Sequence, residues 1–309
     1  MNIKYIIGAL VIVGVVALGS TLTALRTTAP DAAIAASFYP IAFLTEQIAG
    51  SAVPVFSVTP FDTEPHDYEL TPEMALRLST SPLFIHTGAH LEPWANAIIT
   101  ARNAQELPSL TLLTEENALL GEDIPADEPG DAGSEFDPHF WLSPKRAVGA
   151  TGQIALVLAN LYPAHTATFV ANSAALTSEL TRIDTEYRKG LATCASRIIV
   201  TDHDAFGYLA HDYNLTVYAI RGISPDEEPS SATLANITEI VRANGVKTIF
   251  TEELVAPDIA ETIARETGAT VSLLSTIEGL TEDDIAAGND YLSKLRGNLK
   301  TLTSSLECE

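Results

Sequence analysis

The amino-acid sequence predicts an α/β protein built from two similar halves that are joined by one long helix. Three observations support this prediction. The chain has 309 residues, which is long for one domain and comfortable for two. In each half, short β-rich apolar runs alternate with longer helical patterns, as in parallel sheets that are covered by helices on both faces. Between the halves, one helical pattern extends over residues 164–192.

The first residues form a segment of their own. Lys4 is followed by an apolar stretch over residues 5–25, and the next charge is Arg26. A basic start and an apolar run are typical of an export signal, but the run is also near the roughly 20 residues that cross a bilayer. Residues 1–30 are therefore interpreted either as a signal peptide or as an N-terminal membrane anchor. Both interpretations predict an exported protein.

Residues 31–163 are predicted to form the first α/β lobe. Apolar runs rich in β-branched and aromatic residues predict its strands, and amphipathic patterns that begin near proline predict several of its helices. The predicted strands lie at 34–39, 53–58, 83–86 and 110–113, and the helices at 40–49, 72–78, 94–102 and 143–161.

Within this lobe, residues 115–137 form an acidic, proline-containing loop. It holds nine Asp or Glu residues, and no Lys or Arg occurs between Arg102 and Lys145. A run of this kind is usually a solvated loop. The alternative is a weak collector of cations beside a binding site, and the sequence leaves both interpretations open.

The linking helix and the second lobe complete the predicted fold. The apolar residues of the linking helix are spaced for one face, and a helix of this length spans roughly 40 Å. Residues 193–309 repeat the rhythm of the first lobe, with Gly245 and Gly268 as helix stop signals. The predicted strands lie at 197–200, 216–220, 248–250 and 270–274, and the helices at 206–213, 232–244, 257–267 and 283–306.

Charge and cysteine content restrict the possible partners and the compartment. The formal net charge of −23 argues against nucleic acid and anionic membrane surfaces as partners. It would attract cations, but it would equally serve solubility. Only two cysteines occur, Cys194 and Cys308. In an exported protein an isolated pair favours one disulfide, and the alternative is two free thiols.

Three of the seven histidines share one kind of setting. His66, His139 and His203 each lie at the end of a predicted strand or in a loop, with carboxylates next to them in the sequence. In open α/β sheets ligands bind beyond the carboxyl ends of the strands. A neutral imidazole is a good zinc ligand when a carboxylate or carbonyl holds its other nitrogen. The three histidines are therefore candidate metal ligands.

Several short motifs occur along the chain after the first segment. They are Ala36-Ser37-Phe38-Tyr39-Pro40, Glu64-Pro65-His66-Asp67-Tyr68-Glu69, Gly88-Ala89-His90-Leu91-Glu92-Pro93-Trp94, Asp137-Pro138-His139-Phe140-Trp141-Leu142, His203-Asp204-Ala205-Phe206-Gly207-Tyr208-Leu209, Glu228-Pro229-Ser230, Ile277-Glu278-Gly279-Leu280 and Ala287-Gly288-Asn289-Asp290-Tyr291-Leu292. In these motifs and in their order, nearly the whole chain after the first segment resembles the ZnuA-like zinc-binding proteins of ABC importers, a family of metal-binding solute receptors.

The resemblance implies a function, a fold and a binding site. It implies two lobes with parallel sheets joined by one rigid helix, the TroA-like fold, with Zn²⁺ bound in the cleft between the lobes. His66, His139 and His203 match the three histidine ligands of the family, and Glu278 matches its carboxylate ligand. Because manganese-selective relatives have a carboxylate at the third position, His203 favours zinc over Mn²⁺. A disulfide that resembles Cys194–Cys308 is frequent in the zinc branch.

The implied partners are a divalent metal ion and an ABC permease in the membrane with its cytoplasmic ATPase. The implied location is periplasmic or otherwise extracytoplasmic, and we expect a monomer. The sequence leaves three alternatives open: a receptor for manganese or another divalent metal, a metal-binding adhesin of the same fold, and a zinc hydrolase. The hydrolase is disfavoured because four protein ligands leave no position for a reactive water. We therefore expect no enzymatic activity.

The sequence departs from the family pattern at two places. Many zinc-binding members have a histidine-rich loop before the second ligand, whereas residues 115–137 contain no histidine. Asp202 and Asp204 flank His203, where the family has small uncharged residues. They could raise the proton affinity of His203 or supply a hard oxygen ligand. A second pair, His86 and His90, is a candidate for an auxiliary metal site.

Overall fold

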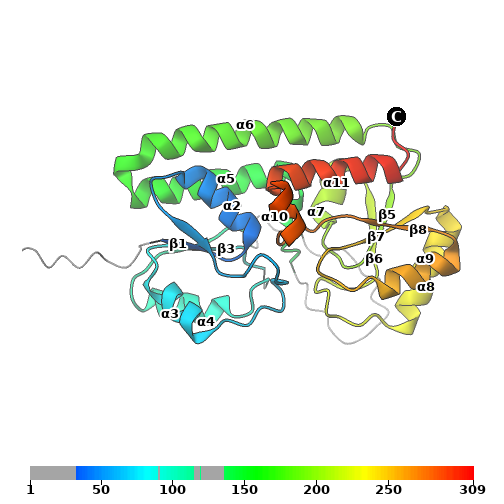
Figure 1. Ribbon diagram of the computed structural model, residues 1–309, viewed down its shortest axis with the longest axis horizontal. Helices are drawn as coiled ribbons and strands as arrows, with labels where there is room; N and C mark the ends of the chain where they lie inside the picture. The colour runs from blue at the N-terminus through cyan, green and yellow to red at the C-terminus, as the bar shows by residue number, and fades with distance from the viewer. Residues whose placement is uncertain (1–32, 90, 115–118, 120–135) are drawn as a thin grey trace, which may run out of the picture. The chain divides into compact units, whose positions relative to one another are not determined.

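The computed structural model describes residues 33–89, 91–114, 119 and 136–309, and Ala33–Glu309 forms one compact unit (Figure 1). The predicted signal or anchor over residues 1–30, most of the acidic loop and His90 lie outside the described residues. None of the described helices is both long and apolar enough to cross a membrane.

The first lobe is a four-stranded parallel sheet with the strand order β2-β1-β3-β4. Helix α2 covers one face of the sheet and packs against the two long helices over residues 144–161 and 166–190. Helices α3 and α4 cover the other face. The short apolar strands therefore have both faces buried, as expected for parallel sheets. The elements are β1 (Ile34–Ala36), α2 (Tyr39–Ala49), β2 (Val55–Ser57), α3 (Pro72–Thr80), β3 (Phe84–His86), α4 (Ala95–Asn103) and β4 (Ser109–Thr111).

The second lobe repeats this arrangement. Its four parallel strands have the order β6-β5-β7-β8, so in both sheets the first strand along the chain lies between the second and the third. This similarity confirms the predicted fold class of two like α/β lobes. The elements are β5 (Ile198–Thr201), α7 (Gly207–Tyr213), β6 (Thr216–Ala219), α8 (Ser231–Asn244), β7 (Thr248–Thr251), α9 (Asp258–Thr267), β8 (Thr270–Leu273), α10 (Glu282–Ala287) and α11 (Tyr291–Ser305).

One part of the predicted second lobe was wrong. The sequence predicts a single helix over residues 283–306, but the chain forms α10 and α11 with a break between them. Gly288 has φ 71° and ends α10 in the left-handed conformation, which glycine adopts without steric cost. Asp290 then accepts a hydrogen bond from the backbone N–H of Ser293 and begins α11. The two capping signals outweigh the helical periodicity on either side.

One long helix, packed against the last helix of the first lobe, joins the lobes. After a short 3-10 turn (Phe140–Leu142), α5 covers residues Pro144–Leu161; a second turn (Pro163–His165) leads into α6, Thr166–Gly190. Helix α6 packs along α5 and then along α11 (Figure 1). The apolar face predicted for this helix is buried, which confirms its pattern. The buried residues are Phe169, Leu176, Leu180, Ile183 and Tyr187.

Polar contacts fasten the second half of α6 to α11. The hydroxyl of Tyr187, itself buried, donates to the carbonyl of Leu295 at 2.6 Å. Arg296 contacts Glu179 at 2.7 Å and Glu186 at 3.1 Å. These partly exposed ion pairs contribute little, whereas the buried hydrogen bond of Tyr187 fixes how the linking helix meets the second lobe.

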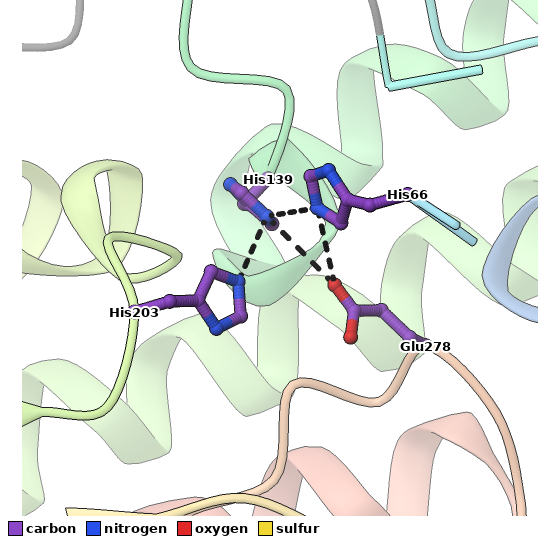
Figure 2. Close-up of side chains that lie close together, drawn as sticks. All are labelled: His66, His139, His203 and Glu278. Carbon is purple, nitrogen blue, oxygen red and sulfur yellow. Dashed lines mark hydrogen bonds and ion pairs between the residues drawn. The ribbon is translucent and has the colours of Figure 1, made fainter. Parts of the chain in front are cut away.

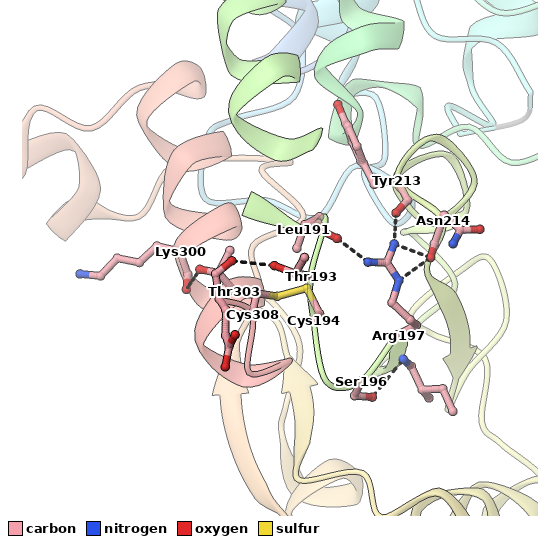
Figure 3. The surroundings of a disulfide bond; sticks show 12 residues. Leu191, Thr193, Cys194, Ser196, Arg197, Tyr213, Asn214, Lys300, Thr303 and Cys308 are labelled. Atoms are coloured by element: carbon pink, nitrogen blue, oxygen red, sulfur yellow. Dashed lines mark hydrogen bonds between the residues drawn. A yellow bond between two sulfur atoms is a disulfide. The ribbon is translucent and has the colours of Figure 1, made fainter. Parts of the chain in front are cut away.

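A disulfide between Cys194 and Cys308 closes the end of the second lobe (Figure 3). It joins the segment that leaves α6 to the last residues of the chain. Backbone hydrogen bonds surround it, from Ala195 to Glu307 at 3.2 Å and from Glu309 to Thr193 at 3.0 Å. The described part of the chain has no free cysteine.

Candidate metal centre

Four loops carry the predicted ligands to one place between the lobes. His66 lies on the segment between β2 and α3, and His139 directly precedes the 3-10 turn of the first lobe. His203 follows β5 by two residues, and Glu278 lies between β8 and α10. Each lobe therefore contributes two of the four side chains, from loops beyond its strands, which is where ligands bind in sheets of this kind.

The four side chains point toward one another (Figure 2). The Nε2 atom of His139 lies 3.2 Å from Nε2 of His66 and 3.3 Å from Nε2 of His203. Oε1 of Glu278 lies 3.7 Å from Nε2 of His139 and 3.9 Å from Nε2 of His66. One ligand atom from each residue lies within 4.8 Å of all the others.

These distances fit a tetrahedral metal ion. Zinc binds imidazole nitrogen at about 2.0–2.1 Å, so two ligands of a regular tetrahedron lie roughly 3.3–3.4 Å apart. The two nitrogen–nitrogen distances from His139 match that value, and the carboxylate oxygen is slightly farther from His139. Three imidazoles and one carboxylate form a donor set that suits zinc.

The site is closed to solvent. The side chains of His139 and His203 are 0% exposed, that of Glu278 is 1% exposed and that of His66 is 7% exposed. One oxygen of Glu278, Oε2, accepts a hydrogen bond from the Thr276 hydroxyl at 2.8 Å. The other oxygen, Oε1, has no hydrogen-bond partner although it is buried. Since an unpaired buried carboxylate oxygen is costly, a cation between the ligands would satisfy it.

Two carboxylates orient two of the imidazoles. Oδ1 of Asp137 lies 2.8 Å from Nδ1 of His139 and accepts the backbone N–H of the same residue at 2.8 Å. The carboxylate of Glu252 likewise contacts both Nδ1 and the backbone N–H of His203. Such contacts hold the proton on Nδ1 and leave the Nε2 lone pair free for a metal.

Sequence reasoning did not single out Glu252. Its signal was available, since Glu252 lies two residues after the strand predicted at 248–250. However, the contact spans 49 residues along the chain, and only the pairing of β5 with β7 brings the two residues together. By contrast, Asp137 lies two residues from its partner and within a recognised motif.

The three imidazoles differ in their affinity for protons. Burial, followed by the neighbouring imidazoles, lowers the pKa of His66 and of His139 well below the usual value. Burial also acts to lower the pKa of His203, but the charge and hydrogen bond of Glu252 outweigh it and the net pKa is raised. At neutral pH, His66 and His139 are therefore uncharged and able to bind a metal without first losing a proton.

Buried carboxylates surround the ligands. Burial raises the pKa of Glu64, of Asp137 and of Asp204 to about 7 in each case. Burial, and then the charges of Glu64 and Glu252, raises the pKa of Glu278 well above its usual value. The environment therefore disfavours several negative charges at once, and a divalent cation would provide the missing positive charge.

The two aspartates that flank His203 do not join the ligand group. Asp202 pairs with the guanidinium of Arg221. The charge of Asp204 is among the causes that raise the pKa of His203, in line with the first of the two roles expected from the sequence. Neither aspartate is among the four residues whose ligand atoms converge.

The segment that carries Glu278 is fixed against the first lobe. The indole of Trp141 donates to the carbonyl of Thr276 at 2.8 Å, and the N–H of Leu280 donates to the carbonyl of Phe61 at 3.0 Å. A Cβ atom on Gly279 would lie 1.8 Å from that same carbonyl oxygen. Ile277 has φ 54°, an unfavourable conformation for a β-branched residue. The position of the carboxylate is thus determined by contacts between the lobes.

The auxiliary site proposed from the sequence stays a prediction. His86 is buried at the end of β3, where its Nε2 lies 2.8 Å from the hydroxyl of Thr111 and its Nδ1 lies 3.9 Å from Glu92. Its proposed partner, His90, lies outside the described residues.

Comparison with known proteins identifies relatives of the whole described chain. A family model described as "Zinc-uptake complex component A periplasmic" (ZnuA) matches residues 34–305. The zinc-binding lipoprotein AdcA of Streptococcus pneumoniae is 36% identical over 281 residues, which are 89% of this chain and 56% of that protein. The chain therefore spans about half the length of this relative.

Two solved structures are similar to this chain over nearly their full length. The Zn(II)-bound ZnuA-like domain of AdcA from Streptococcus pneumoniae is 35% identical, with a TM-score of 0.75, and the match covers 89% of this chain and 98% of the domain. The laminin-binding protein Lmb of Streptococcus agalactiae, described as bifunctional with adhesin and metal-transporting activity, is 30% identical. Its TM-score is 0.77, and the match covers 89% of this chain and 99% of Lmb.

Proposed function

This chain belongs to the ZnuA family of periplasmic zinc-uptake components, and from that membership we propose that it is an extracytoplasmic receptor that binds zinc and delivers it to an ABC importer. The observation that carries the proposal is the convergence of three imidazole nitrogens and one carboxylate oxygen in a closed site between the lobes. Zinc is the cargo of the protein, and binding, retention and release are its whole chemistry.

In this proposal His66, His139, His203 and Glu278 are the four zinc ligands. Two come from each lobe, so the bound ion links the lobes. Nitrogen donors favour zinc over manganese, which prefers oxygen. Zinc is therefore the primary metal and Mn²⁺ the weaker competitor.

The proposed partners are a membrane permease and its cytoplasmic ATPase, and the receptor acts as a monomer. The relatives are named as a zinc-uptake component and a zinc-binding lipoprotein, and both names support an extracytoplasmic location. Residues 1–30 would then act in export or anchoring. The proposed domains are these residues, lobes over 31–163 and 193–309, and the linking helix over 164–192.

Adhesion is a second candidate function, because the similar protein Lmb is described as both an adhesin and a metal transporter. Both functions would use the same metal site, so they differ only in the partner that binds the surface of the protein. A zinc hydrolase has less support. All four positions around a tetrahedral ion would be filled by protein ligands, and none would remain for water.

The metal and the pH dependence test the proposal together. We expect one zinc per chain at about pH 7.5, with manganese unable to displace it at equal concentration. The pKa values of His203 and Glu278 are raised, so protons compete with zinc for both groups as the pH falls. Affinity should therefore fall with falling pH, by roughly ten-fold per pH unit for each displaced proton. A chelator competition between about pH 7.5 and pH 5 measures this.

The outcomes test the ligand set and the identity of the metal. A loss of roughly 100-fold or more across this range supports the imidazole and carboxylate ligands. An affinity that does not change with pH would contradict them, and tighter binding of manganese than of zinc would replace zinc as the cargo.

A further inference from the structure

Two of the three imidazoles at the centre are held by carboxylates, but the two carboxylates are held differently. Asp137 reaches His139 within one short turn of the chain. Glu252 reaches His203 from the end of the neighbouring strand β7, 49 residues away. The second contact therefore depends on the tertiary structure of the second lobe.

Both oxygens of Glu252 are used on the same residue. Oε1 accepts the backbone N–H of His203 at 3.1 Å, and Oε2 lies 2.6 Å from its Nδ1. The two side chains are 2% and 0% exposed, so water cannot substitute for either contact. The backbone contact fixes the carboxylate, and the fixed carboxylate then sets the plane and the tautomer of the ring.

We propose that Glu252 is the positioning residue of the zinc site, which keeps His203 in the Nδ1–H tautomer with its Nε2 lone pair directed at the metal. The inference rests on the proposed function, because it treats His203 as a zinc ligand. Glu252 would not touch the ion. It orients His203, and its contribution is therefore measured as part of the zinc affinity that His203 provides.

An amide at this position distinguishes positioning from packing. Glutamine has nearly the same shape as glutamate, but it offers one acceptor oxygen and one donor group. His203 presents its two N–H groups to different oxygens of Glu252, so a glutamine in the same pose accepts only one of them. If the oxygen keeps the backbone N–H, the amide NH₂ faces Nδ1 and favours the other tautomer, whose protonated Nε2 cannot bind zinc.

Glu253 provides the matched control. It is the next residue in the chain, and its carboxylate contacts Lys294 at 2.6 Å. Glu253→Gln therefore removes one carboxylate charge from the same region without changing the ring contact.

The experiment compares the zinc affinity of wild type, Glu252→Gln and Glu253→Gln by chelator competition. It also records the ¹⁵N signals of the His203 ring in the metal-free proteins at alkaline pH. We expect Glu252→Gln to weaken zinc binding by about 10- to 100-fold and to move His203 toward the Nε2–H tautomer. Glu253→Gln should change neither quantity.

Several results would overturn the inference while leaving the receptor function intact. One is wild-type zinc affinity in Glu252→Gln. Another is weakened binding with an unchanged His203 tautomer, which would mean that only packing was lost. If Glu252→Gln does not fold, Glu252→Asp keeps the charge but shortens the reach, and the same two measurements decide. Failure of the wild-type chain to bind zinc would instead contradict the proposed function itself.

Discussion

Zinc at a thousand-fold excess over its dissociation constant is expected to raise the free energy of unfolding of this protein by about 4 kcal/mol. Metal that binds only the folded chain stabilises it by mass action. For a chain of this size, each kcal/mol raises the melting temperature by roughly 2–4 °C, so the total shift should be near 10 °C. Thermal unfolding with and without zinc measures it.

The control for this prediction is His139→Ala. His139 is central to the site, since its Nε2 lies within 3.7 Å of ligand atoms on three other residues. The variant should show little stabilisation at the same zinc concentration. Equal stabilisation of both proteins would mean that zinc acts somewhere else in the chain.

Removal of the disulfide should produce the other large effect. Cys194 and Cys308 are separated by 114 residues, and cross-linking a loop of this size lowers the entropy of the unfolded chain. The double variant Cys194→Ser, Cys308→Ser is therefore expected to lose up to about 4–5 kcal/mol of stability. Denaturant unfolding of the metal-free proteins measures the loss, with reduced wild type as the control.

The backbone contacts beside the disulfide could reduce the loss of stability when the disulfide is removed. The hydrogen bonds that join residues 193–196 to residues 306–309 can form without the cross-link. A loss below about 1 kcal/mol would mean that they hold the chain end alone and that the entropic argument does not apply here.

The parts of the fold that could be predicted from the sequence are those with local signals. Alternating strands and helices predicted two parallel sheets, and the spacing of apolar residues predicted that α6 has one buried face. The three histidines were candidates because each lies in a loop beside carboxylates. Glu278 has no such setting, and only the resemblance to a family suggested it.

The features that were missed depend on contacts between distant residues. Glu252 contacts His203 across 49 residues of the chain, and Trp141 contacts Thr276 across 135 residues. Asp202 forms an ion pair with Arg221, which lies 19 residues away in the sequence. No local pattern determines these contacts, because they form only when the sheets and lobes are assembled.

The most direct test of the four-ligand site is a zinc titration of wild type beside His203→Ala and Glu278→Ala. Structural zinc sites provide about 10–16 kcal/mol from four ligands, or roughly 3 kcal/mol each, so each variant should lose roughly 100-fold in affinity. We expect one tightly bound zinc per wild-type chain and weaker binding in both variants. Stoichiometric zinc with unchanged affinity in Glu278→Ala would contradict the account, because it would leave an open metal position between the lobes.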